Sequence, residues 1–427
     1  MALQKIISPL TRLSKTEAFS GFFLIGSFVA AIVWSNISPS GYNQFWQQTI
    51  SIGFNNNLIQ KPLLIWINDG LMAFFFFVVG LEIKKEVLYG ELKTWRKALL
   101  PIIGAVGGMV LPAILYFAFN PESPDSSGWG IPMATDIAFS LGILSLLGTR
   151  IPKSGKIFLI ALAIVDDLGA VLVIAFFYSS DISFASLGLG LICAGIMALA
   201  NFLGVRNTVF YGVIGIGGVW FAFLLSGVHP TIAGILAAIT IPANRTVSPS
   251  RFNTLLIQLS SKFKSNNSKH FNNQIVQSIK SSFEGVEPPL QKLEYRFAPW
   301  VNYLVLPLFA LANSGLVFDQ SMQSAIFSPI STGILIGLLL GKPLGICGLI
   351  LLFKKFNWVE FPKSVNLKLI FGISLLAGIG FTMSLFISGL AFERESALIA
   401  SKVGIFTASI ASGLLGYFFL RAQFRKK

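Results

Sequence analysis

The sequence predicts an all-α polytopic membrane protein with twelve transmembrane helices, two of them interrupted. Composition is the first reason: the 427 residues are 54% hydrophobic and only 12% charged, whereas roughly 25% of residues are charged in a soluble protein. The second reason is that the apolar residues fall in runs of the length, about 20 residues, that a helix needs to cross a bilayer. The runs lack the alternation of barrel strands, which favours helices.

Twelve apolar runs are expected to form the spans of one integral membrane domain covering residues 1–427. The run at 229–242 is the shortest of them. The expected spans lie near residues 18–37, 62–83, 98–119, 130–147, 157–178, 185–203, 209–226, 229–242, 297–316, 329–353, 369–389 and 397–420.

The distribution of basic residues predicts the orientation. With twelve spans both termini share one side, and the loops on that side hold 28 of the 32 Lys and Arg residues. The other side holds only Lys61 and Arg394. By the positive-inside rule both termini are cytoplasmic. The net charge of +14 therefore comes from short clusters between spans, and no pattern typical of nucleic-acid binding is present.

Two loops carry further predictions. The stretch TISIGFNNNLIQ at 49–60 alternates apolar and polar residues around an Asn-rich turn, which indicates a hairpin on the outer side. An isolated hairpin is marginally stable, so it is expected to pair, for example with a second subunit in a homodimer; a plain polar loop is the alternative. The cytoplasmic loop at 243–296 is rich in Ser, Asn and Lys and is compatible with a surface helix or a solvated linker.

Four charged residues inside the expected spans point to function. They are Asp136, Asp166, Asp167 and Lys342. A charge at bilayer depth is costly and usually marks an ion path, a proton relay or a counter-ion. Three acids and one lysine can pair and still leave a negative site, which suits a small hard cation. Structural ion pairs between helices are the alternative, although buried pairs are poor stabilisers.

Spans four and eleven are expected to be broken. The fourth contains Pro132 before Thr135 and Asp136, and the eleventh contains Gly378 and Gly380. These residues disturb helices, and non-helical backbone is tolerated at membrane depth where it lines a cavity. The two spans occupy corresponding places if spans 3–5 and 10–12 are inverted repeats. Paired interrupted segments of this kind indicate a transporter site near the midplane.

Motifs around these charges resemble the NhaA family of sodium/proton antiporters over nearly the whole chain. They occur in order and in the spans that carry the charges. The matching stretches are WINDGLMAFFFFVVGLEIKKE (66–86), TDIAF (135–139), AIVDDLGA (163–170), SGVHPTIAG (226–234), LPLFALANSG (306–315), LLLGKPLG (338–345) and GIGFTMS (378–384).

The resemblance implies roles for the charged residues. Asp166 and Asp167 correspond to the paired carboxylates that exchange protons for a cation. Lys342 corresponds to the lysine that interacts with Asp166 and balances the negative ends of the broken helices. Asp136 corresponds to the acid that faces their positive ends, as expected from helix dipoles. Thr135 is expected to add an oxygen ligand for Na+.

The resemblance also implies roles for residues nearer the membrane surfaces. Glu82, Lys85 and Glu86 match a cytoplasmic funnel for cation entry and pH response, whereas sequence alone favours a solvated helix end. Glu294 matches an acid near the ninth span, and Asp69 matches a position near the outer passage.

The chain departs from the family pattern near the ninth span. Tyr295 and Ala298 stand where histidines are often found, and His229 and His270 are the only histidines of the chain. A histidine cluster is therefore not expected to control the pH response. His229 is expected to start a helix.

The expected function is electrogenic export of Na+ or Li+ in exchange for H+, by alternating access in a bacterial inner membrane, with a role in pH homeostasis. The chain is expected not to be an enzyme and to need no cofactor, since Na+, Li+ and H+ are its cargo. A cation channel and an intramembrane aspartyl protease are the alternatives. A channel needs a continuous pore, and a protease needs two acids that face each other and share a proton.

Overall fold

A computed structural model describes residues 17–54, 57–179, 181–245, 254, 257, 287–358 and 365–424. Most of the loop expected at 243–296 lies outside these ranges. The helices are α2 Glu17–Ile37, α3 Pro39–Trp46, α4 Leu63–Trp66, α5 Met72–Tyr89, α6 Trp95–Phe119, α7 Ile137–Leu146, α8 Lys153–Phe177, α9 Phe184–Phe202, α10 Thr208–Ile214, α11 Phe221–Leu224, α12 Pro230–Thr240, α15 Pro289–Trp300, α16 Leu306–Asn313, α17 Gln320–Ile326, α18 Pro329–Ile336, α19 Lys342–Lys355, α20 Leu367–Ala377, α21 Phe381–Ala391 and α22 Glu395–Gln423.

Short π-helical and 3₁₀ segments join several of the α-helices. π-Helical turns at Ile67–Leu71, Gly215–Trp220, Val301–Val305 and Gly337–Gly341 connect α4 to α5, α10 to α11, α15 to α16 and α18 to α19. 3₁₀ segments lie at Glu91–Lys93, Asp125–Met133 and Gly148–Arg150. A π-turn inserts an extra residue per turn and often marks a functional position in a long helix.

Eight helices within the described ranges are long and apolar enough to cross a bilayer, and the bent pair α20–α21 raises the number to nine. Apart from one hairpin, the described part of the chain is thus all-helical, and its apolar helices make it multi-pass. Three of the twelve expected spans fall on helices that do not meet this criterion. They are Thr208–Leu224, Pro230–Thr240 and the continuous helix from α15 to α16.

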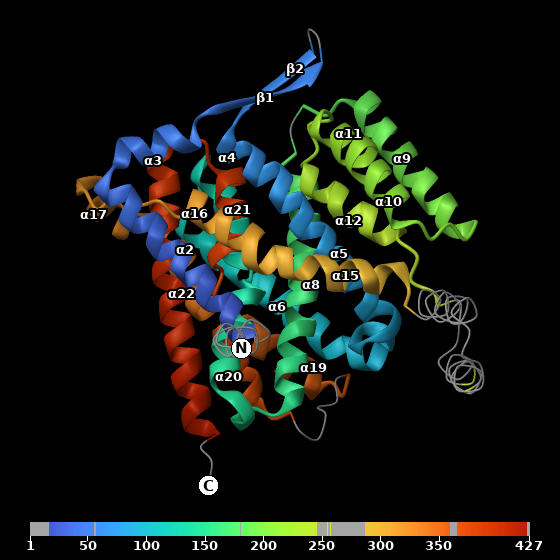
Figure 1. Ribbon diagram of the computed structural model, residues 1–427. Helices are drawn as coiled ribbons and strands as arrows, with labels where there is room; N and C mark the ends of the chain where they lie inside the picture. Colours follow the sequence, from blue (N-terminus) through green and yellow to red (C-terminus); the bar gives the residue numbers. More distant parts are fainter. Residues whose placement is uncertain are drawn as a thin grey trace, which may run out of the picture.

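The stretch expected to form a hairpin holds two antiparallel strands, β1 Thr49–Phe54 and β2 Asn57–Pro62. Thr49 lies opposite Pro62, and Phe54 lies opposite Asn57. The indole Nε1 of Trp66 donates a hydrogen bond to the carbonyl of Ile50 at 3.1 Å and ties the hairpin to α4. Figure 1 shows the hairpin at one end of the helical body, opposite the end where α22 finishes.

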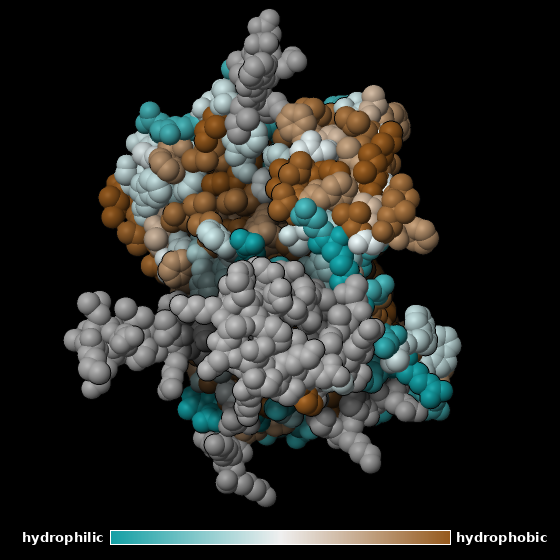
Figure 2. Space-filling view, turned by 45° about the vertical axis from the view of Figure 1, so that its right-hand side comes forward, coloured by the Kyte–Doolittle hydropathy of each residue, from teal (hydrophilic) through white to brown (hydrophobic). Residues whose placement is uncertain are grey.

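The helices form two groups with separate apolar cores. The larger core joins α2, α3, α5 to α8, α16 to α22 and Ile235 of α12, and the smaller joins α9 to α12 with parts of α5 and α15. α9 to α12 lie together at one side of the molecule (Figure 1). Apolar side chains gather on the outer surface over these helices (Figure 2), among them Phe184, Ile192 and Phe202 of α9. Such a surface suits contact with lipid chains.

α6 and α19 cross at an unusually close distance. A Cβ on Gly107 would collide with the carbonyl of Gly345, and a Cβ on Gly345 would collide with the carbonyl of Gly107. Small residues are what allow two helix backbones to approach this closely within a membrane. Lys342 lies one turn before Gly345, and its aliphatic stem passes beside Gly108. The crossing therefore fixes the position of the lysine.

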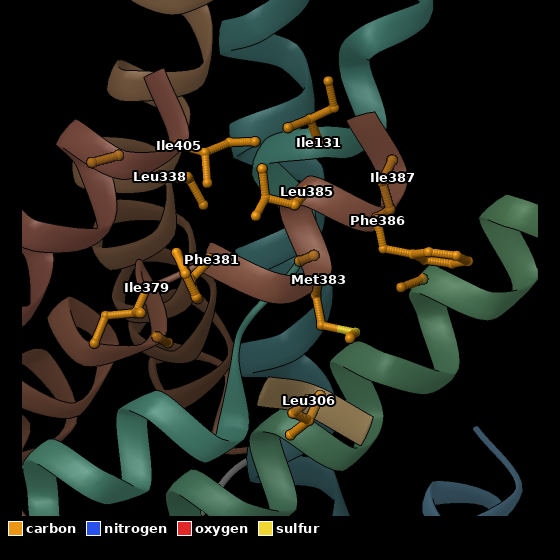
Figure 3. Packing of buried hydrophobic residues seen from close by; sticks show 14 of the residues in the cluster. Ile131, Leu306, Leu338, Ile379, Phe381, Met383, Leu385, Phe386, Ile387 and Ile405 are labelled. Carbon is orange, nitrogen blue, oxygen red and sulfur yellow. The ribbon is translucent and has the colours of Figure 1, made fainter. Parts of the chain in front are cut away.

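The break between α20 and α21 is buried among apolar side chains and a few hydroxyl groups, including that of Ser409, which accepts a hydrogen bond from the N–H of Phe381. The two helices are bent by 48°, and the residues between them include Ile379, which is fully buried. Leu338 of the π-turn before α19 lies against Gly378 and Gly380 of the break, and Figure 3 shows it in the same buried cluster as Ile379 and Phe381. The non-helical backbone is thus buried in protein, as it must be at membrane depth.

Gly345→Ala is expected to destabilise the protein by roughly 1–3 kcal/mol, the usual cost of overpacking. The new methyl group would meet the backbone of Gly107, which cannot rotate away. Gly348→Ala on the same helix is the matched control, because its Cβ would enter open space. Thermal unfolding of both purified variants in detergent measures the difference. Equal melting temperatures would contradict the proposed crossing.

Candidate functional site

The paired aspartates lie in the middle of α8 and are both buried. Asp166 and Asp167 are each 2% exposed. Consecutive residues on a helix point about 100° apart, so the two carboxyls cannot share the same environment. Asp166 faces α19, where its Oδ2 accepts a hydrogen bond from Lys342 Nζ at 2.6 Å.

Lys342 joins this pair to the break before α7. The residue is 1% exposed and begins α19 directly after the π-turn. Besides Asp166, its ammonium donates to Thr135 Oγ1 at 2.8 Å. The Thr135 hydroxyl in turn donates to the carbonyl of Ala377 at 2.9 Å, at the last residue of α20. One lysine thus connects α8 with both interrupted segments.

Asp136 lies where the two interrupted segments cross. Its backbone N–H donates to the carbonyl of Ile379 at 2.7 Å. Its Oδ1 caps α7 by accepting from the N–H of Phe139 at 2.9 Å. Its Oδ2 accepts from the N–H of Thr382 at 3.0 Å and from the Thr382 hydroxyl at 2.5 Å. A single carboxylate therefore meets the first turns of α7 and α21, where the helix dipoles are positive.

The opposite polarity occurs at the end of α20. The carbonyl of Leu376 accepts from the Ser140 hydroxyl at 2.9 Å, and that of Ala377 accepts from Thr135. Carbonyls at a helix C-terminus carry partial negative charge. The ammonium of Lys342 is linked to the Ala377 carbonyl through the Thr135 hydroxyl. Its positive charge therefore stabilises the negative end of α20. Asp136 and Lys342 match the positive and negative helix ends respectively.

Two carboxylate oxygens at the site have no hydrogen-bond partner among the described residues. They are Asp166 Oδ1 and Asp167 Oδ2, and both are buried. A buried polar atom without a partner costs about 1–3 kcal/mol, and more if it is charged. The buried ionisable groups around these two oxygens are the carboxyls of Asp136, Asp166 and Asp167 and the ammonium of Lys342. A proton or a small hard cation would satisfy these oxygens.

The residues expected to form a cytoplasmic funnel lie on the last turns of α5 and on α15. Lys85 Nζ forms an ion pair with Glu294 Oε1 at 2.6 Å. Glu86 Oε2 accepts from the backbone N–H of Glu91 at 3.0 Å, and Glu82 lies one turn earlier on the same helix. The structure thus gathers these four residues at one end of α5.

Asp69 lies at the other end of α5, in the π-turn at Ile67–Leu71. Its carboxylate forms an ion pair with Lys61 of β2 at 2.8 Å and lies 3.8 Å from His229 Nε2. His229 caps the start of α12 through Thr231, in agreement with its expected place at a helix start. The sequence did not reveal that Asp69, Lys61 and His229 lie together, because three separate segments meet there.

Thr382 is the site residue that sequence reasoning missed. It belongs to the stretch GIGFTMS (378–384), but the sequence assigns its hydroxyl no partner. The local signal was present, since Thr382 follows Gly380 and Phe381 at the start of a helix, where first-turn N–H groups need acceptors. The acceptor proved to be Asp136, 246 residues away in the chain.

The chain is similar in sequence to known Na+/H+ antiporters. Residues 11–420 match the model of the family described as Na+/H+ antiporter 1. A protein named Na(+)/H(+) antiporter NhaA from Oleidesulfovibrio alaskensis is 46% identical, over 99% of this chain and 96% of its own length. Proteins of the same name from Koribacter versatilis and Rhodospirillum rubrum are 44% and 41% identical, over 97% and 100% of this chain and 92% and 99% of their own lengths.

Lys342→Ala is expected to lower stability by about 3–5 kcal/mol, because it leaves Asp166 buried without its partner. The double variant Lys342→Ala with Asp166→Asn should lose less stability than the sum of its two single changes. Chemical or thermal unfolding of the four proteins in detergent completes this double-mutant cycle. Strict additivity would show that the two side chains do not interact.

Proposed function

The chain belongs to the Na+/H+ antiporter 1 family, and we propose that it exports Na+ or Li+ from a bacterial cytoplasm in exchange for external protons. It is a transporter and not an enzyme, so the protease hypothesis is set aside. The observation that carries the proposal is the pair of unpartnered oxygens on Asp166 and Asp167. They lie beside a buried lysine at the crossing of two interrupted segments.

Protons and the cation compete for the same carboxylates. Asp167 is the main ligand, and Asp166 and Thr135 supply further oxygens. Asp166 Oδ2 is held by Lys342 in this structure, so a cation that binds there competes with the ammonium. Loading of the cation therefore requires loss of protons from the carboxylate and lysine group. These coupled groups release protons in macroscopic steps that belong to the whole cluster.

Alternating access follows from the interrupted segments. Spans 3–5 and 10–12 are proposed to be inverted repeats within a single membrane domain of twelve spans. Spans four and eleven are its discontinuous helices. The hydrogen bonds from Asp136 and Thr135 across the crossing support movement of the two breaks as one unit. Rocking of this unit exposes the loaded or protonated site to one face at a time.

The orientation places the ends of α5 on opposite sides of the membrane. Both termini and the loop at 243–296 are proposed to be cytoplasmic, and the hairpin is proposed to be external and to join two copies in a homodimer. Glu82, Lys85, Glu86 and Glu294 then surround the cytoplasmic entry of the cation. Asp69 lies near the outer exit.

The exchange is proposed to be electrogenic. If two protons enter for each Na+ that leaves, one net charge moves inward per cycle. A membrane potential of 100 mV then supplies about 2.3 kcal/mol for each cycle.

Asp167→Asn is expected to abolish exchange at every pH, because the amide can neither release a proton nor offer a negative ligand. Na+-induced pH change in vesicles that contain the purified protein measures this. Asp181→Asn is the matched control: this exposed residue has φ of 47°, a backbone conformation that Asn tolerates. Near-normal exchange by Asp167→Asn would contradict the proposed site.

The apparent KM for Na+ is expected to rise as pH falls, by up to about tenfold per pH unit for each proton displaced. The double variant His229→Asn with His270→Gln should keep this dependence, because Asn can cap α12 as His229 does. His270 lies outside the described residues. Exchange rates at several pH values and Na+ concentrations test both statements. A folded double variant that has become indifferent to pH would make a histidine the switch.

A further inference from the structure

A basic cavity lies where α6 and α8 begin and where the chain leaves α19. Its volume is about 790 Å³. The polar part of its lining includes Arg96, Lys97 and Ser154, and Asn357 borders it on the α19 side. No step of the proposed exchange uses this cavity. It lies at the end of the molecule away from the hairpin, because α5 separates the hairpin from the start of α6 (Figure 1).

The charges around the cavity favour an anion. Glu91 is the one acid in the described lining, and it lies 3.7 Å from Lys97 in an exposed ion pair, which contributes little. Arg96 lines the cavity in addition to this pair. Further lysines lie within two residues of lining positions in the sequence, among them Lys93, Lys153, Lys355 and Lys363, against one further acid, Glu360. Basic residues therefore outnumber acids around the cavity.

Two helix N-termini add to this potential. α6 and α8 each have 25 residues, and each begins at the cavity. Their N-cap residues, Thr94 and Pro152, make no side-chain cap hydrogen bond. First-turn N–H groups and the helix dipole favour phosphate-like anions at such ends.

The deeper lining is apolar and indicates what kind of anion fits. Leu100, Phe158 and Ala161 line the cavity and are only 6%, 5% and 3% exposed. Trp95 and Trp358 are 73% and 67% exposed in the same lining. Tryptophan is enriched where protein meets the headgroup region of a bilayer. A charged opening above an apolar floor matches an amphiphile better than a free inorganic ion.

We propose that this cavity binds the phosphate headgroup of an anionic phospholipid from the cytoplasmic leaflet. Arg96 is the principal phosphate contact, since a guanidinium can donate two parallel hydrogen bonds to phosphate oxygens. Lys97 and the neighbouring lysines add charge, and the acyl chains leave along the apolar floor. Basic pockets between transmembrane helices bind such headgroups in general. The inference rests on the orientation given in the proposed function.

The bound lipid would hold together helices that lead to the ion site. α8 runs from Ser154 in the cavity to Asp166, and α19 runs from Lys342 toward Asn357. A lipid in the cavity thus connects the outer turns of two helices whose inner residues form the buried ion pair. We expect it to stabilise the folded protein by mass action, since it binds only the native arrangement.

The test titrates the purified full chain in detergent with dioleoylphosphatidylglycerol and follows its melting temperature. The wild type should gain several degrees, and dioleoylphosphatidylcholine should have little effect. For Arg96→Gln with Lys97→Gln, half-maximal stabilisation should need on the order of tenfold more phosphatidylglycerol. Lys292→Gln with Arg421→Gln is the control, because it removes two exposed basic residues elsewhere and should respond like the wild type.

Three results would overturn the proposal. The first is an equal response of the Arg96 and Lys97 variant and the wild type. The second is equal stabilisation by phosphatidylcholine. The third is equal stabilisation by inorganic phosphate at the same concentration, which would assign the cavity to a free anion. Na+/H+ exchange of the same proteins in vesicles is measured separately, so that a failure of the proposed transport is distinguished from a failure of the lipid site.

Discussion

The ion pair between Lys342 and Asp166 is the interaction on which the rest of the site depends. Both groups are almost fully buried and lie 2.6 Å apart. Neither charge could remain at this depth alone, because removal of one partner leaves the other uncompensated. The pair also requires α8, α19 and the break before α7 to meet at one point. The close crossing of α6 and α19 at Gly107 and Gly345 fixes the position of α19 at that point.

Much of this arrangement could be predicted from the sequence. Asp166 and Asp167 were evident because adjacent carboxylates are rare in an apolar run, and Lys342 was evident for the same reason. Gly378, Gly380 and Pro132 marked positions where a helix is disturbed. The motif resemblance then joined Asp166 to Lys342, a pairing between distant segments that periodicity alone does not determine.

The remaining features depend on tertiary contacts whose partners no local signal identifies. The hydrogen bonds of Thr382 to Asp136 require two breaks to cross, and the meeting of Lys61, Asp69 and His229 requires three segments to converge. Prediction of the number of spans is limited by helix length. α12 has only 11 residues, so its length does not establish a crossing. Gly107 and Gly345 are two among 40 glycines, and only the packing of α6 on α19 distinguishes them.

Na+ and protons are proposed to compete for the carboxylates beside Lys342. Isothermal titration calorimetry of Na+ into the purified protein, repeated in buffers with different ionisation enthalpies, counts the protons released per cation bound. We expect the wild type to release protons at pH values where the site is partly protonated, and Asp167→Asn to release none because Na+ binding is lost. Na+ binding by the wild type without proton release at any pH would contradict the account.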